Sequence, residues 1–503
     1  MTLRLISFFF LGLFFFSCQS PPQKDGATLA KNYCSSCHQF PEPDLLDKAT
    51  WQQEVLPRMG QMMGRYDSPE QRAELLESEA VARWIEARGL YPPQPTISAA
   101  HWQQIEQYYA AEAPGSLPQG EQATLSPNLP HFQFRTPNYQ YSPPSTTLID
   151  IREAGGLWMG DANSTSLTLF SAELELQGVA QVKEGAVSLT ETQDAYGLTV
   201  MGSFSPTDEP SGFLMALPKT TDQAPQVLIS DLQRPVHSDW GDVNQDGLPD
   251  VLIAEFAKWS GGLSWWELRP DGAFEEHRLS DRTGAIKAYW HDLDQDGQED
   301  VVALFGQAQE GIYWYQVDSS GQWTEHPLVE FPPSYGSSSL RLWDADGDGD
   351  SDLLYTAGDN ADYQPILKPY HGVYLFENFG EGKFEEKWFL PLNGAYDAIP
   401  ADFDQDGDMD LAAISFFPDF DQQAQEGFVY FQNQGDFQFA AHTFPEVSLG
   451  RWLVMDVGDV DQDGDQDIAL GSLTFEVIGG GNYVDTWVAN GIPFVILENT
   501  TQP

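Results

Sequence analysis

The chain has little cysteine and little positive charge. Among 503 residues there are 3 cysteines, and 24 Lys and Arg residues stand against 76 Asp and Glu residues, for a formal net charge of −52. So few cysteines exclude a disulfide-rich scaffold. Such an acidic chain repels phosphate backbones, so we expect no binding to nucleic acid. An aromatic content of 13% supplies ample core material and argues against disorder.

One long apolar run is present, at residues 5–16 (LISFFFLGLFFF). It is too short to cross about 30 Å of hydrocarbon comfortably, but it suits the core of a signal peptide. Cys18 follows almost at once, and the segment resembles a bacterial lipoprotein signal; ordinary secretion is the alternative. The resemblance implies that residues 1–17 are removed, that Cys18 carries lipid, and that residues 18–28 form a tether. The protein would then be lipid-anchored in the bacterial cell envelope, in the periplasm or on the outer-membrane surface.

The other two cysteines form the motif C-S-S-C-H, at Cys34, Cys37 and His38. This spacing is the attachment signature of c-type haem, because two thiols bond the two vinyl groups of one porphyrin while the adjacent imidazole ligates the iron. A redox dithiol or half of a zinc site is the alternative. No second C-x-x-C exists to complete a zinc site, and no βαβ pattern surrounds the motif. We therefore predict one covalent haem c.

The second axial ligand is sought among three methionines in residues 49–64. Met59, Met62 and Met63 have the spacing of one helical face, which is also typical of ordinary core packing. The stretch resembles the W…VLP-x-M segment of small class I cytochromes, which implies Met59 as the ligand. Met62, Met63 and His101 stay open as alternatives, the last of these giving a bis-histidine haem. A thioether ligand raises the reduction potential relative to two imidazoles.

Helical segments surround the haem motif. The pattern predicts a helix in residues 49–64 that is interrupted at Pro57, and another over residues 70–88 that ends at Gly89. Residues 98–112 resemble the closing helix of class I cytochromes. These segments predict a small all-α cytochrome c domain over residues 29–113, followed by a linker at 114–129.

Five segments of the remaining chain read D-x-[DN]-x-D-G-x-x-D, and their first residues are 50, 52, 58 and 57 apart. Alternate oxygen ligands in a tight turn suit calcium, and the glycine permits the bend. An EF-hand is excluded, because position 12 is never Glu and short apolar strands follow each loop. Acidic turns without metal are the alternative. The candidate ligands for about five calcium ions are Asp242, Asn244, Asp246 and Asp250; Asp292, Asp294, Asp296 and Asp300; Asp344, Asp346, Asp348 and Asp352; Asp402, Asp404, Asp406 and Asp410; Asp459, Asp461, Asp463 and Asp467.

Each repeat offers about four strands in roughly fifty residues, which is the rhythm of a propeller blade. The pattern over residues 230–500 resembles the FG-GAP/VCBS repeat family, whose blades carry calcium in the acidic loop. Residues 144–230 keep the rhythm without the motif and fit two degenerate blades. We therefore expect a mainly β fold, with a seven-bladed β-propeller over residues 130–503. Residues 130–136 are expected to supply the missing strand of the last blade.

The strand before each acidic loop is expected to border the central channel. Its polar positions include five candidate ligand or catalytic residues: His237, Lys287, Arg341, Asp397 and Arg451. One interpretation is a ring of mutually satisfied charges; the other is a site for an anionic or polyhydroxy compound. No nucleotide fingerprint or nucleophile elbow accompanies them.

Three functions fit these features. The first is an envelope-anchored electron carrier whose propeller docks a redox protein or another ligand. The second is a haem-linked oxidoreductase with a small substrate in the propeller channel. A one-electron haem alone is a poor partner for two-electron hydride chemistry, which favours the carrier. The third is an envelope lipoprotein that binds glycan or protein. The sequence leaves the oligomeric state open.

Overall fold

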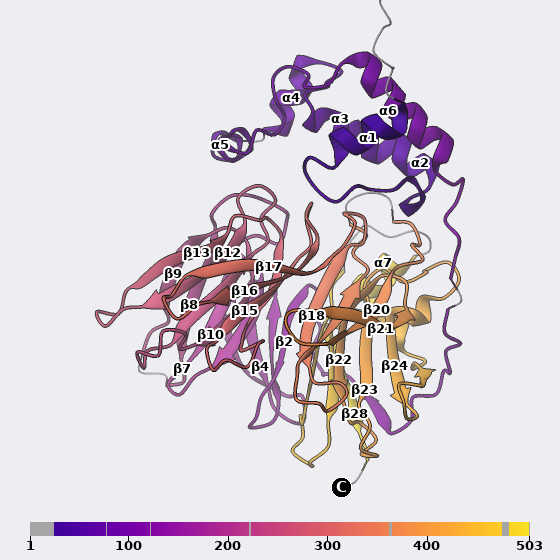
Figure 1. Cartoon of the computed structure of the whole chain (residues 1–503). Helices are drawn as coiled ribbons and strands as arrows, with labels where there is room; N and C mark the ends of the chain where they lie inside the picture. The colour runs from indigo at the N-terminus through magenta and orange to yellow at the C-terminus, as the bar shows by residue number, and fades with distance from the viewer. Residues whose placement is uncertain are drawn as a thin grey trace, which may run out of the picture.

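A computed structural model describes residues 25–76, 78–120, 122–220, 223–361, 365–474 and 482–501. The expected signal and Cys18 lie outside these residues. In the described part of the chain, no helix is long and apolar enough to cross a membrane. A small helical domain sits on one end of a β-propeller (Figure 1).

The helical domain agrees with the predicted segments except in two places, since the predicted interruption at Pro57 is absent and α3 runs through this residue. Residues 70–88 form two helices, because the Ser78 hydroxyl accepts the amide of Val81 and starts a second helix. Asp25 caps the first helix in the same way. The helical elements are α1 (Gly26–Cys34), a 3₁₀ turn (Pro43–Leu45), α2 (Lys48–Thr50), a π-helical turn (Trp51–Val55), α3 (Leu56–Met62), α4 (Pro69–Leu75), α5 (Glu79–Ala87) and α6 (Ala99–Glu112).

Pro57 lies at the start of α3, directly after the π-helical turn. A proline has no amide hydrogen for the helix ladder, and here the wider turn leads into it without ending the helical path. Trp51 fixes this region: its indole donates to the carbonyl of Pro43 at 2.9 Å, and its ring lies 4.4 Å from the ring of Tyr109. The helices therefore pack around one aromatic centre.

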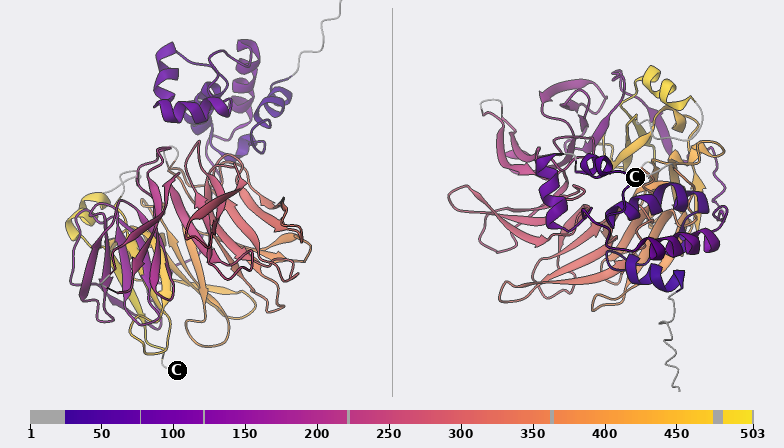
Figure 2. Two further views of the ribbon diagram at one scale, coloured as in Figure 1. Left: turned by 90° about the vertical axis from the view of Figure 1, so that its left-hand side faces the viewer. Right: turned by 90° about the horizontal axis from the view of Figure 1, so that it is seen from above.

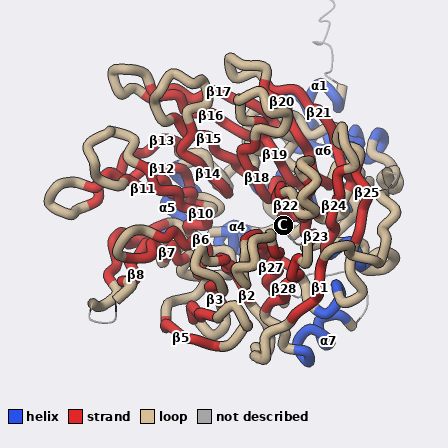
Figure 3. The backbone as a smooth tube through the Cα atoms, turned by 90° about the horizontal axis from the view of Figure 1, so that it is seen from below, coloured by secondary structure: helices blue, strands red, loops and turns tan. Residues whose placement is uncertain are grey.

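The β region forms seven four-stranded antiparallel sheets within the described residues, arranged around a centre (Figure 3). We number them as blades in chain order. Blade 1 is β2 (Thr146–Ile151), β3 (Leu157–Asp161), β4 (Ser166–Phe170) and β5 (Leu176–Gln181); blade 2 is β6 (Ala186–Glu191), β7 (Ala195–Val200), β8 (Gly212–Pro218) and β9 (Gln226–Leu232). Blade 3 is β10 (Pro235–Gly241), β11 (Asp250–Glu255), β12 (Gly262–Leu268) and β13 (Phe274–Ser280); blade 4 is β14 (Ala285–His291), β15 (Asp300–Phe305), β16 (Gly311–Val317) and β17 (Trp323–Glu330).

The last three blades carry the remaining acidic loops. Blade 5 is β18 (Ser337–Trp343), β19 (Asp352–Ala357), β20 (Gly372–Asn378) and β21 (Phe384–Pro391); blade 6 is β22 (Ala395–Ala401), β23 (Asp410–Ser415), β24 (Phe428–Asn433) and β25 (Phe439–His442). Short 3₁₀ turns at Ala424–Gly427 and Val447–Leu449 and the helix α7 (Tyr483–Asn490) lie in loops. Blade 7 is β26 (Trp452–Gly458), β27 (Asp467–Ser472), β28 (Phe494–Asn499) and β1 (Phe132–Arg135).

The predicted closure of the ring is confirmed. β1 pairs antiparallel with β28, with Phe132 opposite Asn499, so a strand from before the first blade completes the last one. The two degenerate blades also form as expected. The seven-bladed, mainly β architecture is therefore as the sequence predicts.

The two ends of the propeller are chemically different. In blades 3–7 every acidic loop joins the first strand to the second, so these loops share one end of the ring. The loops between second and third strands lie at the other end, and there the helical domain sits over one side of the ring (Figure 2). The second strands are buried along their whole length, because neighbouring blades cover both of their faces.

Candidate functional site

The C-S-S-C-H motif lies where α1 ends and the chain turns toward the propeller. Cys34 is the last residue of the helix and is half-buried, while Cys37 is exposed, and both thiols are free. The Ser36 hydroxyl donates to the carbonyl of Tyr33 at 2.6 Å and stabilises this turn. The motif is therefore held in an ordered turn, and neither sulfur atom is in a disulfide bond.

The ring of His38 is oriented for ligation. Its Nδ1 lies 2.7 Å from the carbonyl oxygen of Gln39, and a carbonyl can only accept, so Nδ1 carries the hydrogen. The lone pair of the neutral ring is then on Nε2. A hydrogen bond from the other ring nitrogen is the usual support of a metal-bound histidine. Burial lowers the pKa of His38, which also favours the neutral, ligating form. These residues fit the iron of a covalent haem.

The thiol of Cys34 is unlike that of a redox dithiol. Burial raises its pKa to about 11. Reactive dithiols instead have thiol pKa values well below the ordinary range, because only the thiolate attacks a disulfide. The environment of Cys34 therefore disfavours a reactive thiolate at this position.

The structure separates the three methionines. Met59 and Met63 are partly buried against the same apolar cluster as the thiol of Cys34. Met62 points elsewhere and packs in the cluster formed by α5. The Nδ1 atom of His101 lies 3.2 Å from the hydroxyl of Tyr33. Met59 and Met63 thus lie on the same side of the helical domain as Cys34.

The five acidic loops share one backbone conformation. In the first, the amides of Asp246 and Gly247 both donate to the carboxylate of Asp242, at 3.0 and 2.9 Å. The glycine at the sixth position has φ between 87° and 101° in all five loops, a region that other residues rarely adopt: Gly247, Gly297, Gly349, Gly407 and Gly464. The turn therefore directs several side-chain oxygens of each loop toward a common point.

Carboxylate oxygens from three positions gather within 4.8 Å of one another in four loops. The groups are Asp292, Asp294 and Asp296; Asp344, Asp346 and Asp348; Asp402, Asp404 and Asp406; Asp459, Asp461 and Asp467. In the remaining loop the third position is Asn244, whose oxygen is also a calcium ligand type. Several anionic oxygens this close together repel one another unless a cation lies between them.

The aspartate at the ninth position of each loop is buried, and it also joins the loop to the third strand of its blade. One oxygen of each of these carboxylates accepts a backbone amide from the end of the third strand: Leu268 for Asp250, Val317 for Asp300, Asn378 for Asp352, Asn433 for Asp410 and Asn499 for Asp467. Burial raises the pKa of Asp300 and Asp410 to about 6 and that of Asp467 to about 7. The other oxygen of Asp250 is buried and accepts nothing from the described residues. In the other four loops this oxygen accepts a bond from a protein donor: Trp314, Ala345, Tyr430 or Val460.

Most of the polar residues of the channel join neighbouring blades. Four side chains three positions before an acidic loop bond the backbone of the next inner strand, at 2.7–2.9 Å. The pairs are Asp239 with the amide of Trp290, Tyr289 with the carbonyl of Leu340, Arg341 with the carbonyl of Ala398, and Asp456 with the amide of Ile151. These side chains close the ring and are not free for a ligand.

Lys287 and His237 differ from the other channel residues. Arg341 is paired with Asp397 at 2.7 Å, so these two charges neutralise each other. Lys287 makes no hydrogen bond or ion pair with any residue that the structure describes, and burial lowers its pKa to about 8. Burial and the charge of Lys287 also hold the pKa of His237 well below its usual range. Nδ1 of His237 accepts the amide of Ala288 on the next inner strand at 3.5 Å, so the amine of Lys287 is the group left without a partner among the described residues.

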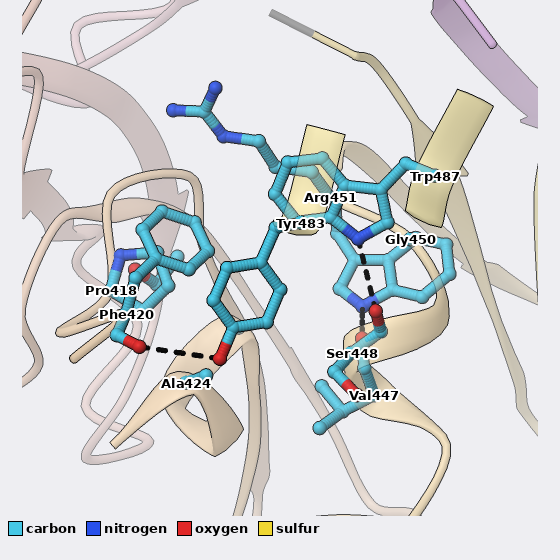
Figure 4. Close-up of a pocket in the computed structure, with 12 residues that line it drawn as sticks. Pro418, Phe420, Ala424, Val447, Ser448, Gly450, Arg451, Tyr483 and Trp487 are labelled. Carbon is cyan, nitrogen blue, oxygen red and sulfur yellow. Dashed lines mark hydrogen bonds between the residues drawn. The ribbon is translucent and has the colours of Figure 1, made fainter. Parts of the chain in front are cut away.

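The structure places Arg451 outside this set. Its guanidinium lies 3.7 Å from the ring centre of Phe416, and its Nε donates to the carbonyl of the same residue at 2.8 Å. Figure 4 shows it beside Trp487 and Tyr483. These residues line a cavity of about 10 Å³, which is room for one water. Burial lowers its pKa to about 9. The side chain of Arg451 therefore packs between blades 6 and 7 and does not anchor a ligand in the channel.

The amino-acid sequence does not predict the contacts between the two domains. Trp259, between β11 and β12, packs against Val81, Ile85 and Tyr91 of the helical domain and is 6% exposed. Arg88 donates to its carbonyl at 2.5 Å.

The β-propeller class is thus defined by the described sheets, and comparison with known proteins adds the repeat type. The model of the FG-GAP-like repeat matches residues 242–303 and 292–355, so the chain carries FG-GAP-like repeats in blades 3–5. No curated protein matches the chain.

Solved structures of similar shape have low identity. Virginiamycin B lyase from Staphylococcus aureus is 11% identical, with a TM-score of 0.44, over 73% of this chain and 99% of that one. A streptogramin B lyase is 13% identical, with a TM-score of 0.45, over 73% and 97%. BBS1N, in complex with ARL6DN, is 11% identical, with a TM-score of 0.46, over 75% and 99%. These likenesses are too distant to inform function.

Proposed function

We propose that the protein is an envelope-anchored c-type cytochrome that transfers single electrons and uses its calcium-binding propeller to dock a partner. The observation that carries this proposal is the C-S-S-C-H turn with its oriented histidine. Cys34 and Cys37 would hold the porphyrin, and His38 would ligate the iron through Nε2, with Met59 as the second axial ligand. The bound haem supplies reversible one-electron chemistry.

The chain's own residues prepare this site. The carbonyl of Gln39 fixes the tautomer of His38, and burial keeps the imidazole neutral. Helices α1 and α6 pack the apolar side of the motif around Tyr109. Five calcium ions would bind the carboxylates of the acidic loops, at the end of the propeller that faces away from the helical domain. They would stabilise the blades without contacting the redox site. A lipid on Cys18 would anchor the whole protein to a membrane.

Haem attachment is the direct test. Expression with its own signal, in a bacterium that matures c-type cytochromes, should give protein whose haem stays bound after denaturation, at one haem per chain. Replacing Cys34 and Cys37 together by Ser should abolish that haem. Ser36→Ala, inside the same motif, is the matched control and should keep it. Haem stain and intact mass measure both. Parent protein without covalent haem would refute the proposal.

A second candidate rests on Lys287, the amine in the channel without a partner among the described residues. In this alternative the channel binds an anionic or polyhydroxy substrate and the haem removes its electrons one at a time. Candidate substrates are mixed anaerobically with the oxidised protein, and the haem spectrum is recorded. For the carrier we expect reduction by a redox protein and by none of the small substrates. Substrate-driven reduction that is lost in Lys287→Ala and kept in Lys258→Ala would establish the enzyme instead.

A further inference from the structure

A cleft of about 420 Å³ separates the haem-attachment turn from blade 4. One side is formed by residues 35–39, which include Cys37 and His38. The other side is formed by propeller residues around Arg282 and Tyr313. Cys37 and His38 therefore line a cleft whose other wall belongs to the propeller.

A chain of hydrogen bonds holds blade 4 to the haem-attachment turn. Gln309, in the loop between β15 and β16, donates through Nε2 to the carbonyl of Cys37 at 3.3 Å. Arg282 donates in turn to the side-chain oxygen of Gln309. The guanidinium also lies 3.9 Å from the ring centre of Tyr313 and is paired with Glu325 at 2.6 Å. The two sides of the cleft are thus fixed to each other by defined contacts.

The charges on the propeller side are mainly negative. Glu325 and Glu330 are exposed residues of the cleft wall, opposed there by Arg282. Glu310 also lines the cleft, but its carboxylate is directed into the propeller, where it accepts the amides of Gly336 and Ser337. The wall that faces His38 therefore carries more carboxylates than cations.

We infer that blade 4 and the link that leads into it from β13 form a wall of the haem site, and that their charged residues, Arg282 and Glu330 above all, set the reduction potential of the haem. This inference rests on the proposed haem attachment. Reduction adds one negative charge at the iron, so a nearby carboxylate favours the oxidised state and a nearby guanidinium favours the reduced state. The propeller then tunes the carrier electrostatically, through a domain that contributes no ligand to the iron.

The test measures the haem potential in single-charge variants of the full chain. Glu330→Gln should shift the potential upward, because a negative charge is lost, and Arg282→Gln should shift it downward. The matched controls are Glu275→Gln and Arg269→Gln, a pair 2.6 Å apart at the propeller end that carries the acidic loops. Neither control should shift it. Measurement by spectroelectrochemistry at low ionic strength keeps exposed charges from being screened.

Opposite shifts of the potential in Glu330→Gln and Arg282→Gln, with no shift in the two controls, support the inference. General loosening of the cleft would shift both potentials in the same direction. Unchanged potentials in both, or shifts of one sign, overturn it while leaving the proposed function intact. Parent protein without covalent haem overturns both, and this is seen before any potential is measured. Glu330 is exposed, so Glu330→Gln stays informative even where Arg282→Gln disturbs the fold.

Discussion

Removing calcium from the folded protein should lower its melting temperature by more than about 10 °C. A ligand present at 100 times its dissociation constant stabilises the folded state by about 2.7 kcal/mol for each site, and the sequence provides five loops. The carboxylates left behind would repel one another at the points where first and second strands join. The measurement is thermal unfolding followed by far-UV circular dichroism, before and after treatment with a strong calcium chelator.

Two controls assign this effect to the loops. Calcium added in excess should restore the melting temperature, whereas magnesium should not, because magnesium demands a smaller and more rigid octahedral site. Asp404→Asn removes a charge from the grouped carboxylates of blade 6, and it should weaken calcium binding. Asp408→Asn removes the same charge four residues further on, outside that group, and should change little. An unchanged melting temperature after chelation would show that the loops are empty or dispensable.

The propeller could be predicted closely because each blade repeats the same short pattern. The acidic motif marks the junction of first and second strands, and the apolar run after it marks the second strand. Even the closing strand at Phe132–Arg135 can be predicted, because the last blade is one strand short and this segment has a strand-like sequence. The split between α4 and α5 was missed, although Ser78 is a good helix cap, because the apolar pattern runs on through it.

The candidate sites could be predicted only in part. The proposed haem and calcium motifs are local, so their residues can be proposed from spacing alone. What each side chain contacts depends on the packing of distant segments. Arg451 illustrates this: its position suggests the channel, but Phe416, on another blade, holds its guanidinium. Gln309 and Cys37 meet across 272 residues of chain, and no sequence periodicity indicates such a contact.

The domain interface should depend on a single tryptophan. The Trp259 ring lies edge-on to Tyr91 at 5.7 Å and is enclosed by α5, so Trp259→Ala leaves a cavity between the propeller and the helices. Truncations of this kind cost about 3–5 kcal/mol. The loss falls on the docking of α5, because the propeller strands do not depend on this side chain. We therefore expect amides of residues 79–87 to exchange hydrogen at least roughly 100-fold faster, with the blades unchanged.

Hydrogen exchange with mass spectrometry measures both regions in one sample. The matched control is Trp84→Ala, which removes the same side chain from α5 itself, where it is 41% exposed and contributes little packing. Equal protection of α5 in both variants would contradict the assigned role of Trp259. If Trp259→Ala also opens the cleft beside His38, the proposed haem should bind added cyanide or imidazole faster in this variant than in the parent protein, since residues 35–39 contact blade 4 only while the domains stay docked. Faster ligand entry together with intact blades would show that the propeller shields the haem as a docked domain and not through the covalent linker alone.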